Sequence, residues 1–183
     1  PVPQKVPSSG IALSDQEISD GTVTADVTLA AVGPITGCEI IVGFDNETLS
    51  YLAVGLSGYH DAMFSIREWA SVSKNPGEQP RWIPYAGGGD RRNLKPKRKY
   101  SIRVDVSGSR IELALDGVPV AAATVPANPR RRRQVGIRCS NHADIVIEKF
   151  VVQGGKPRAF VVMQFSEPYD KVYSDVIRSV CDS

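Results

Sequence analysis

The residues best suited to ligand chemistry lie in the middle of the sequence, where aromatic rings occur among long polar side chains. Sugars bind by stacking on aromatic faces and by hydrogen bonding to planar polar groups, so this composition could serve a glycan. The candidate ligand-binding residues are Tyr51, Tyr59, His60, Arg67, Trp69, Trp82, Tyr85, Arg92 and Asn93. The alternative for the two tryptophans is an ordinary place in the core or at the base of a loop.

Catalytic and metal-binding patterns are not evident. Glycan hydrolases with paired carboxylates need both on one strand face, about 5–10 Å apart across the scissile bond. The acids of the predicted strands are instead single residues, for which a solvated outer face is the default: Glu39, Glu68, Glu112 and Glu148. Three cysteines and two histidines form no zinc-site spacing. We therefore expect no catalytic residue, metal or cofactor in this chain.

Two basic segments could hold phosphates. One is the run Arg130–Arg133, and the other comprises residues 91–99. No aromatic residue interleaves with the arginine run, and prolines flank it, so a solvated loop is the preferred interpretation. With 22 Lys and Arg against 20 Asp and Glu, the net charge of +2 indicates neither a nucleic-acid nor a membrane partner.

The three cysteines are Cys38, Cys139 and Cys181. The first two lie in strand-like runs, where a small buried apolar side chain is the default interpretation. An odd count without an evident disulfide framework favours a reducing compartment. Because no secretory signal or membrane span is visible either, we expect a cytoplasmic protein.

The elements that must position the candidate residues are short strands. In the clearest, Tyr100, Ile102, Val104 and Val106 alternate with polar residues, a period of two that marks a half-buried antiparallel strand. Strands are predicted over residues 22–29, 38–44, 51–56, 63–69, 100–106, 111–115, 118–125, 134–139 and 144–152. Many short strands at regular spacing predict an all-β sandwich or barrel.

Two details refine this prediction. Prolines and glycines are so dense in residues 71–99 that we expect mainly loop there, forming one wall of the ligand groove. The apolar alternation slips phase between Ile147 and Phe150, which predicts either a β-bulge or burial on both faces.

The character of the chain changes after Gly154. Ala159–Phe165 reads as a strand buried on both faces, and Pro168–Cys181 carries one apolar helical stripe. We therefore expect four segments: a leader over residues 1–10, an all-β domain over 11–153, a linker over 154–158, and the truncated start of an α/β domain over 159–183.

Both parts resemble known families. Residues 100–120, YSIRVDVSGSRIELALDGVPV, resemble a hairpin of concanavalin-like jelly rolls, including laminin-G-like and keto-disaccharide hydrolase-like domains, and residues 135–152 resemble their closing strands. That resemblance implies a two-sheet antiparallel jelly-roll sandwich over residues 11–153. Residues 159–181 resemble the opening of nucleoside 2-deoxyribosyltransferase-like and TIR-like domains, although Gln164 stands where proline is usual. That resemblance implies one edge of a nucleotide pocket, whose catalytic Glu would lie beyond Ser183.

The combined expectation is a non-catalytic recognition or sensor module. It would bind a carbohydrate-like or nucleotide-like ligand, or a protein surface, and regulate a C-terminal nucleotide-processing effector. The alternatives are a glycan-cleaving enzyme and a structural module that forms homo-oligomers, for example through the C-terminal helix.

Overall fold

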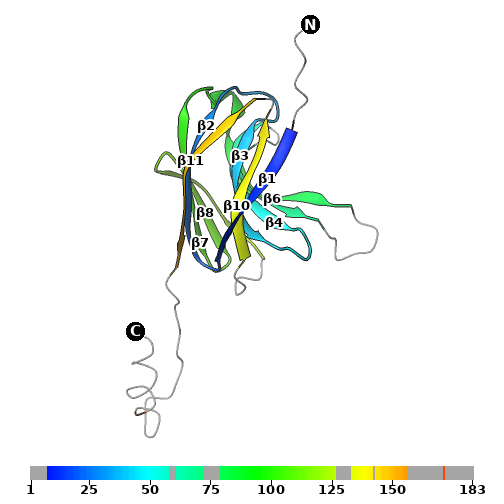
Figure 1. Ribbon diagram of the computed structural model, residues 1–183, viewed down its shortest axis with the longest axis vertical. Coiled ribbons are helices and arrows are strands. Elements are labelled where there is room, and N and C mark those ends of the chain that lie inside the picture. Colours follow the sequence, from blue (N-terminus) through cyan, green and yellow to red (C-terminus); the bar gives the residue numbers. More distant parts are fainter. Residues whose placement is uncertain are drawn as a thin grey trace.

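Two antiparallel sheets pack face to face in the part of the chain that the computed structural model describes, residues 8–57, 61–71, 79–126, 133–141, 143–155 and 171 (Figure 1). The six-stranded sheet has the order β1 (Ser8–Ile18), β10 (Arg133–Asn141), β3 (Gly37–Phe44), β4 (Tyr51–Leu56), β5 (Ala62–Ala70), β6 (Arg81–Asp90). The five-stranded sheet has the order β11 (Ile145–Gly154), β2 (Gly21–Leu29), β7 (Lys99–Ser107), β8 (Arg110–Leu115), β9 (Val118–Thr124). A short 3-10 helix, η1 (Arg91–Asn93), follows β6.

The core fills the space between the sheets, and it is built as the period-two pattern predicts. Val104 and Leu113, partners across β7 and β8, are completely buried. Arg103 and Glu112 on the same two strands are exposed on the outer face. Because successive side chains of a strand point to opposite faces, this alternation gives each sheet one apolar face to bury.

The β-bulge predicted near the end of the sandwich is confirmed. The register of β11 against β2 shifts between Glu148 and Val151, and Lys149 within this stretch has a positive φ of 51°. An extra residue in one strand explains why the apolar alternation changes phase there.

The prediction that residues 71–99 are mainly loop was wrong for residues 81–90, which form β6. As the edge strand of its sheet, β6 can contain Pro84, which has no N–H to donate to a ladder. Its glycines are packed: a Cβ at Gly88 would lie 3.3 Å from the ring of Phe64, and one at Gly89 would lie 2.9 Å from Met63. The prolines and glycines of residues 81–90 are therefore compatible with an edge strand that packs against bulky side chains.

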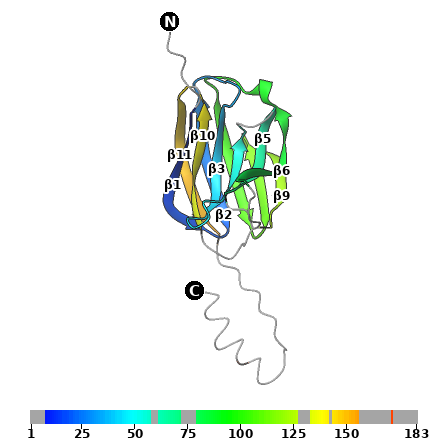
Figure 2. The same cartoon turned by 90° about the vertical axis from the view of Figure 1, so that its right-hand side faces the viewer.

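The edge strands of the two sheets contact each other on both sides of the sandwich. On one side β6 contacts β9, and on the other β1 contacts β11 (Figure 2). Strand β1 begins at Ser8, so the last three residues of the predicted leader belong to the six-stranded sheet.

The predicted strand Ala159–Phe165 and helix Pro168–Cys181 lie outside the described residues, apart from Lys171. No helix among the described residues is long and apolar enough to cross a membrane.

Candidate functional site

The outer face of the six-stranded sheet carries a buried ionic cluster. Arg67 on β5 donates to both carboxylate oxygens of Glu39 on β3, from Nε at 2.8 Å and from Nη2 at 2.7 Å. Arg138 on β10 donates from Nη1 to Glu39 Oε2 at 2.9 Å. The Glu39 side chain is 0% exposed, that of Arg67 3% and that of Arg138 16%. One carboxylate therefore holds two guanidinium groups in a desolvated setting, with a net charge of +1.

Small residues on the intervening strand let this cluster form. Glu39 pairs with Gly55 on β4, and Arg67 pairs with Ala53 on the same strand. Gly55 has a φ of 150°, and a Cβ there would lie only 2.8 Å from the carbonyl oxygen of Cys38. The absence of side-chain bulk at these two positions leaves room for the Glu39 carboxylate to reach the Arg67 guanidinium across β4.

Aromatic rings surround the cluster. The Arg67 Cζ lies 3.9 Å from the centroid of the Trp82 ring, and the Arg138 Cζ lies 5.1 Å from it. Trp82 also contacts Trp69 at 5.3 Å and Tyr51 at 5.9 Å between centroids. The rings thus fix the planes of both guanidinium groups, since a cation over an aromatic face is attracted by its quadrupole.

The Tyr51 hydroxyl belongs to the same network. Burial raises its pKa above the usual value of 10.0, although the neighbouring Arg138 opposes that shift. Tyr51 therefore stays a neutral phenol at physiological pH. Phe44 stacks on it at 5.8 Å between centroids and extends the aromatic surface.

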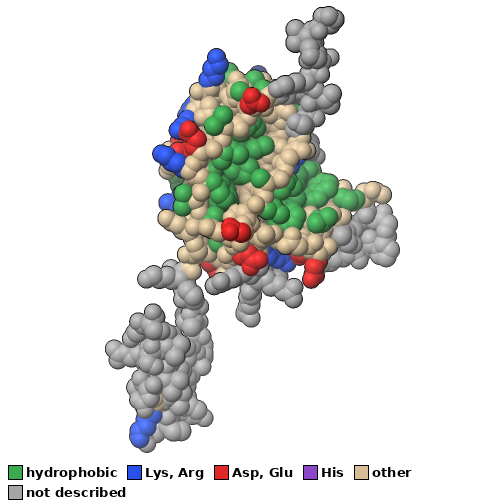
Figure 3. Space-filling view, viewed as in Figure 1, with side chains coloured by type: hydrophobic (Ala, Val, Ile, Leu, Met, Phe, Trp, Pro, Cys, Tyr) green, Lys and Arg blue, Asp and Glu red, His purple; other side chains and the backbone are tan. Residues whose placement is uncertain are grey.

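An open groove of about 500 Å³ lies over these rings. Hydrophobic side chains gather over the region of β4 and β6 in the space-filling view (Figure 3). The described residues that line the groove include no aspartate or glutamate: Ser9, Gly10, Ile11, Phe44, Leu49, Tyr51, Trp69, Ser71, Trp82 and Arg138. Its surface thus combines ring faces, hydroxyl groups and one guanidinium.

A second hollow, of about 380 Å³, lies beside Arg67 and Pro84. Ser65 is among the residues that line it, and the Ser65 hydroxyl oxygen is buried without a hydrogen-bond partner among the described residues. Trp82 lines the groove and Pro84 lines the hollow, and the two residues lie two positions apart on the same face of β6. The groove and the hollow are therefore neighbours. An orphaned hydroxyl costs free energy unless water or a ligand satisfies it.

The structure brings together four of the predicted site residues: Tyr51, Arg67, Trp69 and Trp82. The two tryptophans are partly buried and pack outside the main core, in a smaller cluster with Ile41, Tyr51 and Ala53. They therefore pack outside the main core, and as direct partners in the β5–β6 ladder they flank the connection between those two strands.

The other predicted residues lie elsewhere. Tyr85 packs against the main core and donates its hydroxyl to Glu68 at 2.6 Å, a contact that together with burial raises the Tyr85 pKa. Arg92 and Asn93 are exposed in η1, which follows the C-terminal end of β6. Trp82 lies near the other end of that strand, so at the usual rise per residue the two ends are roughly 25 Å apart. Tyr59 and His60 lie outside the described residues.

Sequence reasoning missed two members of the site, Glu39 and Arg138. The prediction that Glu39 lies on a solvated outer face was wrong, since its side chain is completely buried. The available signal was a charge within a nearly continuous apolar strand, CEIIVGF for Glu39 and VGIRCSN for Arg138. Such a charge is seldom buried unless it is paired, and the partner is not visible from one strand alone.

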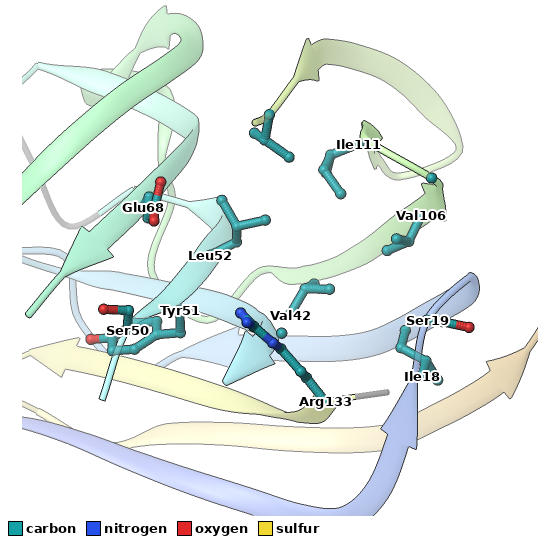
Figure 4. A pocket seen from close by; sticks show the side chains of 13 residues that line it. Ile18, Ser19, Val42, Ser50, Tyr51, Leu52, Glu68, Val106, Ile111 and Arg133 are labelled. Carbon is teal, nitrogen blue, oxygen red and sulfur yellow. The ribbon is translucent and has the colours of Figure 1, made fainter. Parts of the chain in front are cut away.

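Two other hollows are less suited to a ligand. One, of about 70 Å³, opens between the sheets, with Leu52 and Val42 facing Val106 and Ile111 (Figure 4). It is much smaller than the groove of about 500 Å³ over the rings. The other surrounds Arg91, which donates to the carbonyl oxygens of Gly33, Thr36 and Ser57. Those bonds tie loops together and give Arg91 a structural role.

Comparisons with known proteins agree with the architecture. No family model and no curated protein sequence matches the chain. Among solved structures, the carbohydrate-binding module CBM66 from Bacillus subtilis matches with a TM-score of 0.60 at 16% identity, over 78% of this chain and 80% of that one.

Two further structures are more distant. Sheep galectin-11 in complex with glycerol matches with a TM-score of 0.45 at 7% identity, over 81% of this chain and 100% of that one. The kappa-carrageenase from Pseudoalteromonas carrageenovora, in complex with an oligotetrasaccharide, matches with a TM-score of 0.46 at 17% identity, over 75% of this chain and 54% of that one. The likeness to the carbohydrate-binding module shows the fold: the described chain is an antiparallel jelly-roll sandwich of concanavalin-like architecture.

Proposed function

We propose that this domain is a non-catalytic glycan-recognition module that binds a saccharide in the groove over Tyr51, Trp69 and Trp82. The observation that carries the proposal is the combination of ring faces with the buried Glu39–Arg67–Arg138 cluster. Stacking surfaces and rigidly held planar polar groups are what sugar rings and their hydroxyls require. The groove volume of about 500 Å³ falls in the range of small-molecule sites.

The geometry favours binding over cleavage. Glu39 is the carboxylate of the cluster, and both its oxygens are engaged by arginines. A general acid or base must exchange a proton with substrate, which a completely buried, doubly paired carboxylate is poorly placed to do. The described lining of the groove offers no second acid to complete a hydrolytic pair.

The geometry also favours a sugar over a nucleotide. Phosphate sites gather several cationic or backbone N–H donors around the anion. Here Arg138 is the cation among the described groove residues, and it already donates to Glu39.

A glycan array followed by calorimetric titration of the best saccharide tests this function. We expect Trp82→Ala to weaken binding at least tenfold, which corresponds to about 1.4 kcal/mol of lost stacking. Arg103→Ala is the matched control, because Arg103 is exposed on the outer face of the other sheet. Thermal melting accompanies each variant, and Trp82→Phe retains a ring in case the alanine variant is poorly folded. A wild-type protein that binds no saccharide, or unchanged affinity in a folded Trp82→Ala, would contradict the proposal.

We further propose that the module regulates a C-terminal nucleotide-processing domain. The support is the resemblance of residues 159–181 to the opening of such domains, directly after β11, the strand that ends at Gly154. Hydrogen exchange of the 183-residue chain, with and without the saccharide, tests it. Changed protection within residues 159–181 on binding is the expected result, and identical exchange there would refute the regulatory role while leaving recognition intact.

A further inference from the structure

We propose that Cys38 and Cys139 form a disulfide bond that joins β3 to β10 beneath the candidate site. The two residues are direct partners in the antiparallel register, and their sulfur atoms lie 3.6 Å apart. Directly opposed residues of antiparallel strands have Cα atoms about 4.5 or 5.5 Å apart, and both separations fall within the range that disulfides span. The cross-link therefore needs a small approach of the two sulfur atoms and no change of register.

The two thiols have different environments, which assigns them different roles. Cys38 is 1% exposed, whereas Cys139 is only partly buried. On its other side Cys139 pairs with Gly10 of β1, where an added Cβ would meet no atom within 4 Å. The hydrogen bond between the thiols lowers the pKa of Cys139 and raises that of Cys38, which burial raises further. Cys139 is thus the accessible nucleophile and Cys38 the buried resolving thiol.

Oxidation proceeds by exchange with a low-molecular-weight disulfide. The Cys139 thiolate attacks one sulfur of the oxidant, forms a mixed disulfide and releases one thiolate. The Cys38 thiol then loses its proton and attacks Cys139 Sγ, which displaces the second thiolate. In total two protein thiols become one cystine, and one oxidant disulfide becomes two thiols. A reducing compartment reverses the sequence.

The cross-link acts on the site through its position. Glu39 and Arg138, the next pair in the same register, stand on the opposite face of the sheet and share the ion pair of the groove floor. A disulfide between Cys38 and Cys139, the adjacent pair, would fix the spacing between β3 and β10, the two strands that carry Glu39 and Arg138. The bond also closes a loop between residues 101 apart in sequence, so it restricts the unfolded chain strongly.

Treatment of the folded chain with glutathione disulfide tests the proposal, in a Cys181→Ser background that excludes pairing with the third cysteine. We expect an intact mass lower by about 2 Da, a linked Cys38–Cys139 peptide after digestion, and a melting temperature higher by roughly 10 °C, reversed by dithiothreitol. Additional Cys139→Ser should abolish the reaction, and additional Cys38→Ser should trap the glutathione adduct on Cys139, since the resolving thiol is then missing.

Three results would overturn the inference. The first is two free thiols after prolonged oxidation of the folded protein. The second is a persistent glutathione adduct in the protein that retains both cysteines. The third is a cross-linked protein that melts at a lower temperature than the reduced one, because the native register would then be incompatible with the bond.

Discussion

Replacing Glu39 by glutamine removes the one charge that both buried arginines share. Glutamine keeps the size of the side chain and one acceptor oxygen, so the change isolates the charge. Arg67 is 3% exposed and Arg138 16%, so neither guanidinium gains full access to water when its carboxylate partner is lost. Removing one partner of a buried ion pair costs about 3–5 kcal/mol.

That loss is a large part of the total stability, since domains of this kind unfold with about 5–15 kcal/mol. At about 2–4 °C per kcal/mol, we expect the melting temperature to fall by roughly 6–20 °C. The protein contains two tryptophans: Trp82 lies against both arginines of the cluster, and Trp69 contacts Trp82. Unfolding by guanidinium chloride, followed by tryptophan fluorescence, therefore reports directly on the affected region.

The matched control is Glu112→Gln, which breaks an exposed pair with Arg110 on the outer face of β8. Surface pairs contribute between zero and about 1 kcal/mol, so this variant should stay within 1 kcal/mol of wild type. A triple replacement of Glu39, Arg67 and Arg138 by methionine should recover most of the stability, because no buried charge is left alone. The reasoning is refuted if Glu39→Gln destabilises no more than the control at an unchanged denaturant slope.

Three further outcomes are expected. Gly136→Ala should lower the free energy of unfolding by at least about 2 kcal/mol, because the new Cβ would lie 2.3 Å from the Ala12 carbonyl oxygen across the β1–β10 ladder. The control is Gly10→Ala on β1, where the new Cβ meets no atom within 4 Å and the free energy of unfolding should change by less than about 0.5 kcal/mol. Leu113→Ala should cost about 2–5 kcal/mol, because this side chain is completely buried between the sheets; a smaller loss would place it outside the tightly packed core. The hydrogen bond with Arg103 lowers the pKa of Asp105 below its ordinary 3.8, so the stabilisation from this carboxylate is complete above pH 3.8 and is lost as pH falls through its pKa in the folded protein. Unfolding midpoints of wild type and Asp105→Asn should accordingly differ at pH 7 and converge at the lowest pH at which both fold, and a constant difference across pH would argue against this origin.

Several features of the fold could be predicted from local patterns. The period-two alternation of residues 100–115 was enough to assign β7 and β8 and their buried faces, because a strand exposes alternate side chains to opposite sides. The phase slip near Ile147 located the bulge of β11 for the same reason. The composition of β6 misled, since prolines and glycines are compatible with an edge strand whose context is not visible locally.

The aromatic half of the candidate site was also visible in sequence. The rings of Tyr51, Trp69 and Trp82 are conspicuous by type, and the adjacency of β4 and β5 follows from their short connection. Trp82 was expected in the site from its residue type alone. The pairing of β6 with β5 that places it beside Trp69 was not predicted, because residues 81–90 were expected to be loop.

The sequence by itself thus determined which strand faces are apolar, and so the all-β class of the fold. Only the tertiary structure decided which polar side chains meet. Glu39 reaches Arg67 and Arg138 across 28 and 99 residues, and Cys38 meets Cys139 across 101. These meetings depend on the order β10-β3-β4-β5 and on its register, which are set by long-range pairing. A one-residue slip in any ladder would turn those side chains to the opposite face, and no local pattern along a single strand records which partner strand lies beside it.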